Sequence, residues 1–103
     1  MDKTYLLNGH GTFHHENGNL YEGDFNQGWQ HGHGKYTWSD GSSYEGGWQY
    51  DRKHGLGKLT YADGGYRKGS WELQNYCGIH RLYNKEGQLI KEVNEDTGEE
   101  VRK

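Results

Sequence analysis

Polar and hydrophobic residues alternate with a period of two along much of this chain. In residues 21–25 (YEGDF), the two rings and the glycine fall on one side and the two carboxylates on the other. After the turn-like residues 26–28, the same alternation places Gly34, Tyr36 and Trp38 on one face. Such alternation predicts half-buried β-strands, and the turn-forming residues 39–42 (SDGS) between them predict antiparallel hairpins.

The alternating segments recur every 23 residues, the interval that separates Gly23, Gly46 and Gly69. The other columns in phase are Gly9, Gly32, Gly55 and Gly78; Gly18, Gly41, Gly64 and Gly87; Phe25, Trp48 and Trp71; and Phe13, Tyr36, Leu59 and Leu82. A fixed period of this kind indicates stacked structural units. We therefore predict an all-β fold, an elongated single sheet of stacked antiparallel β-hairpins, with Gly23, Gly46 and Gly69 at equivalent backbone positions.

Two units carry a complete motif. Residues 44–48 (YEGGW), 54–57 (HGLG) and 63–64 (DG) form one, and residues 21–25 (YEGDF), 31–34 (HGHG) and 40–41 (DG) form the other, after a half unit at 8–11 (NGHG) and 17–18 (NG). This pattern resembles the MORN repeat signature over about residues 8–90. The resemblance implies a binding or scaffold module without catalysis, such as a subunit of a cytoskeletal or axonemal assembly. The alternative it leaves open is a peripheral phospholipid-binding module.

The third unit departs from the motif. Arg67 and Lys68 stand where Tyr and Glu are expected, and residues 77–80 (CGIH) replace the H-G-x-G element. Terminal units of an array are expected to be atypical because they cap it. We divide the chain into an array at 1–90, of about three units plus the leading half unit, and a charged tail or cap at 91–103. That tail is either frayed or a short hairpin of 89–93 with 99–101.

Composition and charge narrow the class of protein. Only 29% of the residues are hydrophobic, but 9 Tyr, 4 Trp and 2 Phe can build a core where aliphatic residues are scarce. The net charge of −3 argues against a nucleic-acid partner. No apolar run approaches a membrane span, residues 1–7 lack a signal peptide, and Cys77 is the only cysteine. We expect an intracellular location, cytoplasmic or cytoskeletal, with an organelle left open.

Seven histidines raise the question of a metal site. His31 and His54 share a column with Cys77, and His10 shares another with His33. Equivalent positions in a hairpin array lie two strands, or ~10 Å, apart, which is too far for a shared ion. We therefore expect structural histidines and no bound metal.

Catalytic chemistry is not expected. Cys77 and His80 are three residues apart on a predicted strand, so their side chains point to opposite faces. No motif for an oxyanion hole or an activating third group accompanies them. The sequence predicts no enzyme and no cofactor.

Aromatic residues are the main binding candidates. The columns and their flanking rings are predicted to form one face, kept open by the glycines of neighbouring strands, on which a helix or extended segment of a protein partner could lie. These residues are Tyr21, Phe25, Tyr36, Trp38, Tyr44, Trp48, Tyr61 and Trp71. A basic cluster of Lys53, Lys58, Arg67 and Lys68 could instead contact phosphate or an anionic membrane surface. A solvated face is the more ordinary interpretation of that cluster.

Overall fold

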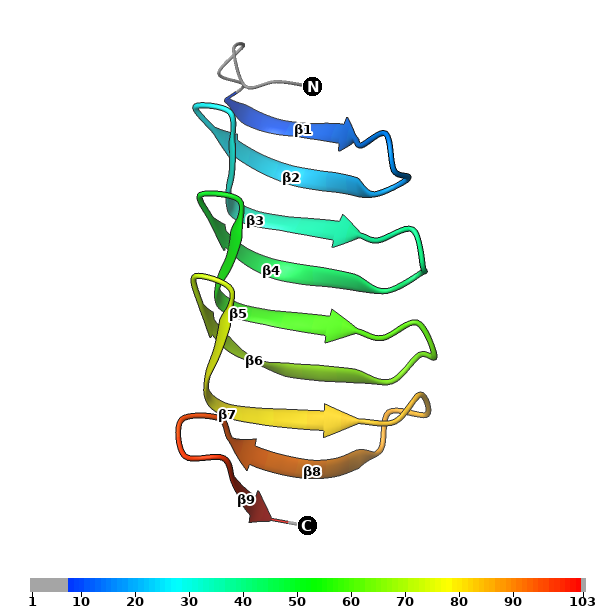
Figure 1. Cartoon of the computed structure of the whole chain (residues 1–103), viewed down its shortest axis with the longest axis vertical. Helices are drawn as coiled ribbons and strands as arrows, with labels where there is room; N and C mark the ends of the chain where they lie inside the picture. The colour runs from blue at the N-terminus through cyan, green and yellow to red at the C-terminus, as the bar shows by residue number, and fades with distance from the viewer. Residues whose placement is uncertain (1–7, 103) are drawn as a thin grey trace.

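The chain folds into one open antiparallel sheet whose strands follow one another in sequence order. The computed structural model describes residues 8–102. Its strands are β1 (Gly9–His14), β2 (Leu20–Asn26), β3 (Trp29–Thr37), β4 (Ser43–Gln49), β5 (Arg52–Thr60), β6 (Tyr66–Glu72), β7 (Asn75–Tyr83), β8 (Leu89–Asn94) and β9 (Glu99–Arg102). They stack like rungs along a 47 Å axis, with β1 and β9 at opposite ends (Figure 1). Over residues 8–102 there is no helix that could cross a membrane.

Two kinds of turn alternate along the two long edges of the sheet. On one edge, Gly18, Gly41, Gly64 and Gly87 each donate a backbone hydrogen bond to the carbonyl three residues earlier, with φ between +85° and +99°. On the other edge, pairs such as Tyr50-Asp51 have two consecutive positive φ angles, the signature of a tight type I′ hairpin turn. The glycine columns at the first edge therefore reflect a backbone conformation that other residues avoid.

The strand register repeats from one unit to the next. Gly23 lies opposite Gly34, Gly46 opposite Gly57, and the strand register shifts just beyond Gly23 and again just beyond Gly46. The third unit has a similar shift one position earlier, between Lys68 and Ser70. Gly69 faces Gly57 on the preceding strand as Gly46 faces Gly34. The predicted equivalence of the three glycine positions is confirmed, as is the all-β hairpin array.

The core is a row of aromatic rings on one face of the sheet, which we call the inner face. Tyr21, Phe25, Tyr44, Trp48 and Trp71 are buried, and no second layer of secondary structure from residues 8–102 covers them. The rings cover one another: Tyr44, for example, makes edge-on contacts with Trp48 and with Trp71 at centroid distances of 5.2 and 4.9 Å. Each such contact stabilises the fold by roughly 0.5–1.5 kcal/mol beyond the effect of the area it buries. A thin sheet with few aliphatic residues can therefore be stable.

The sheet continues beyond residue 90. Of the two alternatives for the C-terminal segment, the structure has the hairpin: β8 and β9 pair antiparallel around the turn at 95–98. This turn is tied back to the array, because the backbone N–H of Glu95 donates to the carbonyl of Gly78 at 2.8 Å. Residues 91–102 therefore extend the array.

Candidate functional site

Five of the eight aromatic candidates are core residues. Tyr21 and Tyr44 are fully buried, and Phe25, Trp48 and Trp71 are at most 7% exposed. The expectation that neighbouring glycines keep the aromatic surface open is wrong. A Cβ at Gly34 would lie 2.1 Å from the hydroxyl of Tyr21, so the ring already fills the space that the glycine leaves.

The same tyrosine–glycine arrangement occurs twice. The Tyr21 hydroxyl donates to the Asp24 carbonyl at 2.9 Å, and the Tyr44 hydroxyl donates to the Gly47 carbonyl at 3.1 Å. Burial raises the pKa of Tyr44 to about 12, and it also raises the pKa of Tyr21. Both hydroxyls therefore remain donors at neutral pH and fix the backbone of β2 and β4 where the strand register shifts. These rings are structural.

The third unit makes the equivalent hydrogen bond from the opposite strand. Arg67 stands at the tyrosine position and His80 at the glycine position, and the His80 ring fills the space above Gly69. His80 Nε2 lies 2.7 Å from the Ser70 carbonyl, and His80 Nδ1 lies 3.3 Å from Arg67 Nη1. Because Arg67 can only donate, Nδ1 accepts and Nε2 carries the proton. His80 is therefore neutral, and burial lowers its pKa.

Arg67 is held by the C-terminal turn. Its Nη1 forms an ion pair with Glu95 at 2.9 Å, and its Nε donates to the Tyr61 hydroxyl at 3.0 Å. Burial alone would lower the pKa of Arg67, but the hydrogen bond with Glu95 and the interactions with Tyr61 and Tyr76 together outweigh it, so the pKa is raised. The guanidinium also lies over the ring of Tyr76, 4.1 Å from its centroid. The departure of the third unit from the motif is thus an alternative packing solution that fastens the β8–β9 hairpin.

Two of the three remaining aromatic candidates, Trp38 and Tyr61, line an open cleft at the glycine-turn edge of the inner face. Trp38 and Tyr36 are half-buried and lie against each other at a centroid distance of 5.0 Å, and Tyr61 is 38% exposed. The cleft has a volume of about 560 Å³. It is lined by Asn17, Asn19, Trp38, Ser39, Asp40, Ser42, Lys53, Leu59 and Tyr61.

Lys53 gives this cleft a cation. Its Nζ lies 5.2 Å from the ring centroid of Trp38 and 5.6 Å from that of Tyr44. Burial lowers its pKa, and its side-chain hydrogen bond goes to the neutral amide of Gln74 at 3.5 Å. In the part of the chain that the structure describes, the ion pairs do not include Lys53. The cleft therefore combines partly exposed rings with a half-buried ammonium group.

Comparison with protein families identifies the repeat. The MORN repeat model matches residues 6–20, 21–43 and 44–66, which together make up more than half of the chain. The chain belongs to the MORN repeat family. MORN repeats are generally protein- or lipid-binding modules, and the family is typically non-enzymatic. A comparison with curated proteins found no match.

The third MORN-like unit lies outside the matched segments but has the same hairpin geometry. Residues 67–90 carry β6, β7 and the start of β8. The β6–β7 pairing has a register shift like those of the matched units, and the β7–β8 pairing has an additional shift between Leu82 and Tyr83. In this unit Arg67 and His80 replace the Tyr and Gly of the matched units, which changes the side chains and keeps the hydrogen bond to the backbone.

The basic candidates are divided between the two faces of the MORN sheet. Lys53 and Arg67 lie on the inner face, among the rings already described. Lys58 and Lys68 alternate with inward-facing neighbours and lie opposite each other on the outer face. The four residues therefore do not form one cluster, and any site on the outer face uses only the last two.

Sequence reasoning missed three residues beside Lys58 and Lys68. Arg81 lies opposite Lys68, and Tyr66 lies opposite Tyr83 with its ring stacked at a centroid distance of 4.8 Å. The strand register is the signal that could have found them, because the 23-residue period and the turn lengths together place positions 58, 68 and 81 side by side.

The structure also shows where the histidines, the acidic residues and Cys77 lie relative to one another. Within residues 8–102, no three His, Cys, Asp or Glu side chains come together as a metal site would need. His10 lies 3.4 Å from Asp24, and His33 lies 3.9 Å from Glu45. Burial and nearby carboxylates raise the pKa of Cys77, which makes its thiolate scarcer and its thiol less reactive.

Proposed function

We propose that this chain is a non-catalytic protein-binding module whose inner-face cleft takes a segment of a partner protein. The cleft offers the half-buried ring of Trp38 and the exposed ring of Tyr61, and rings of this kind are favoured as anchors at the centre of interfaces. The buried rings below hold the shape of the cleft without contacting a partner directly. The proposal extends to a subunit role in a larger assembly, cytoskeletal or axonemal, for which the family resemblance is the support.

Lys53 is the observation that carries the proposal. Its ammonium group is half-buried beside two rings and, among the described residues, forms no ion pair with a carboxylate. A desolvated charge is expensive unless it is paired. A partner segment that places an Asp or Glu side chain, or a terminal carboxylate, next to an apolar residue would satisfy both the ammonium group and the rings.

The test separates the cleft from the rest of the surface. Affinity capture compares the wild-type chain with Trp38→Leu and Lys53→Gln, and with Lys35→Gln as a matched control at an exposed lysine of the outer face. The partner should be lost with the first two variants and kept with the control. For the purified pair, Trp38→Leu should weaken binding by about 2 kcal/mol, or about thirty-fold in Kd.

Circular dichroism must first show that each variant is folded, because Tyr36 and Trp38 also contact the core. A Lys53→Glu variant should bind again when the partner's acidic residue is changed to Lys. Folded cleft variants that bind the partner with unchanged affinity would refute the proposal.

A further inference from the structure

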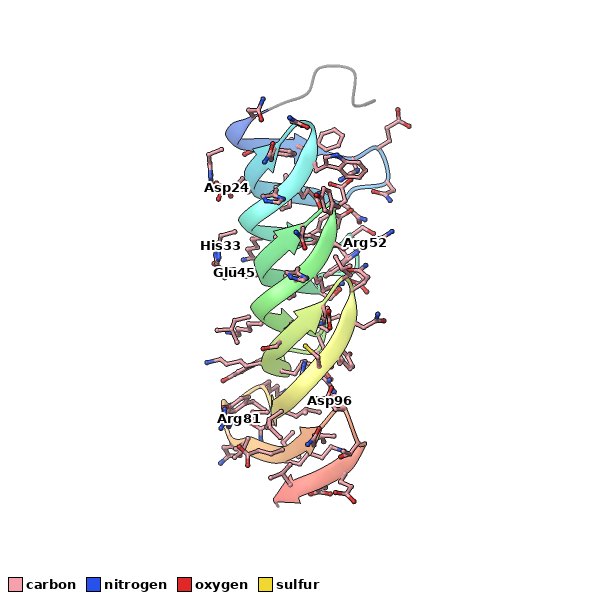
Figure 2. The ribbon with its side chains drawn as sticks, turned by 90° about the vertical axis from the view of Figure 1, so that its left-hand side faces the viewer. Asp24, His33, Glu45, Arg52, Arg81 and Asp96 are labelled. Atoms are coloured by element: carbon pink, nitrogen blue, oxygen red, sulfur yellow. The ribbon has the colours of Figure 1, made fainter. Side chains whose placement is uncertain are left out.

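Charged residues on the outer face form a ladder across the strands. Glu22 lies opposite Lys35, Lys35 opposite Glu45, and Glu45 opposite Lys58, so opposite charges face each other at every step from β2 to β5. Figure 2 shows Glu45 and Arg81 on the same side of the ribbon, which is the outer face. Alternating charges directly across strands stabilise a sheet.

The alternation breaks in the third unit. Lys58 lies opposite Lys68, and Lys68 lies opposite Arg81, which puts three cations side by side on β5, β6 and β7. The break comes from position 68 alone, because the equivalent residues of the earlier units are Glu22 and Glu45. Like charges directly opposite each other destabilise a sheet. Lys68 thus places like charges opposite each other, and a glutamate at this position would remove the repulsion.

Among the described residues, neither Lys58 nor Lys68 forms an ion pair with a carboxylate. Arg81, in contrast, is paired with Glu92. Adjacent strands are ~4.8 Å apart, so the ammonium groups of both lysines can reach one small anion between them.

Two stacked tyrosine rings form one wall of this patch. Tyr66 and Tyr83 stack at a centroid distance of 4.8 Å with an angle of 15° between the rings. Lys58 Nζ lies 4.4 Å from the Tyr66 centroid, and Lys68 Nζ lies 5.9 Å from Tyr66 and 5.8 Å from Tyr83. Both ammonium groups are thus held beside the same ring pair. Cation–π contacts orient a cation without cancelling its charge.

We propose that Lys58 and Lys68, with Arg81 beside them, form a binding site for a phosphate group on the outer face. A phosphate group carries up to two negative charges in a volume that two neighbouring ammonium groups can enclose. Glu45 and Glu92 bound the cations on the two sides of the ladder. A flat anionic membrane lying on this face would meet those carboxylates as well, so a compact anion fits better than a lipid surface. The site is separate from the inner-face cleft and does not depend on it.

Inorganic phosphate is the first probe. Backbone amide chemical shifts of the whole chain would be followed by NMR during a phosphate titration, with chloride adjusted to keep the ionic strength constant. We expect saturable shifts that are confined to β5, β6 and β7. Lys68→Gln should weaken binding by at least about tenfold, as the loss of a charge-assisted hydrogen bond implies. Lys35→Gln, the matched control, should leave the affinity unchanged.

Thermal unfolding supplies a second readout. In phosphate-free buffer, Lys68→Glu restores the alternation of the ladder and should raise Tm above that of the wild type. Added phosphate should raise the Tm of the wild type and leave that of Lys68→Glu unchanged, because a ligand that binds only the folded state stabilises it. Shifts spread over the whole sheet, or equal phosphate binding by Lys68→Gln, would overturn the proposal.

Vesicle co-sedimentation distinguishes the source of the anion. Phosphatidylcholine vesicles would be compared with vesicles that also contain phosphatidic acid, which presents a phosphate monoester, or phosphatidylserine. Lys68-dependent binding to phosphatidic acid alone would support the site and assign it to a lipid phosphate, and binding of inorganic phosphate without vesicle binding would support a soluble ligand. Equal binding to both anionic lipids with no response to inorganic phosphate would show a general membrane surface and refute the phosphate site.

Discussion

Replacing Gly57 with Ala tests whether the tyrosine–glycine contact holds the array together. An added Cβ at Gly57 would lie 2.2 Å from the Tyr44 hydroxyl oxygen and 2.5 Å from two ring carbons. Ordinary contacts for a Cβ are 3.4–4 Å, so the ring would have to move by about 1 Å. Tyr44 has no free space for that movement, because it is fully buried between Trp48 and Trp71.

Three contributions to the free energy of unfolding set the size of the effect. Overpacking a rigid core by one methyl group costs roughly 1–3 kcal/mol, and displacing the ring weakens the hydrogen bond to the Gly47 carbonyl, which contributes about 1 kcal/mol. Against these, Ala in a strand interior is favoured over Gly by roughly 0.5–1 kcal/mol. We therefore expect Gly57→Ala to lower the free energy of unfolding by about 1–3.5 kcal/mol.

Urea unfolding followed by circular dichroism and tryptophan fluorescence measures this change. The midpoint should fall with the slope unchanged, as expected for a loss of stability without a change in the unfolded chain. In a Tyr44→Leu background the clash is absent, so the same glycine substitution should be neutral or stabilising. If Gly57→Ala in the otherwise wild-type chain is neutral or stabilising, the Tyr44 ring does not occupy the space above the glycine.

Two further predictions concern the third unit. The pKa of His80 is lowered in the folded chain, so the unfolded chain takes up a proton at a higher pH. The free energy of unfolding should therefore fall as the pH drops below about 6.5. His80→Gln keeps a donor and an acceptor and should remove that part of the pH dependence of the urea midpoint. An identical pH dependence in both proteins would contradict the assignment of His80 as buried and neutral. Glu95→Gln leaves the Arg67 guanidinium without its carboxylate and should lower the free energy of unfolding by about 2–4 kcal/mol. Amide hydrogen exchange should then become faster first in β8 and β9. Uniform protection across the sheet would contradict the role of this ion pair in holding the β8–β9 hairpin.

The cleft residues show where sequence reasoning reached its limit. Trp38 and Tyr61 were recognised as binding candidates by residue type and alternation, but so were Tyr21 and Trp48, which are core residues. Alternation assigns a side chain to a face of the sheet and does not tell how deeply neighbouring rings cover it. Likewise, Lys53 and Lys68 looked like members of one cluster until the strand register placed them on opposite faces.

The sequence alone determined the architecture, because the 23-residue period, the two-residue alternation and the turn glycines are local properties that each hairpin expresses by itself. Tertiary structure decided the roles of individual side chains. These roles depend on which residues face each other across strands. The Tyr44 ring fills the space above Gly57, and His80 makes the tyrosine's hydrogen bond from the opposite strand. Lys58, Lys68 and Arg81 lie side by side for the same reason. Those pairings follow from the register and the bulges, which join positions ten or more residues apart, and the physical chemistry of each side chain is set by the neighbours it meets there.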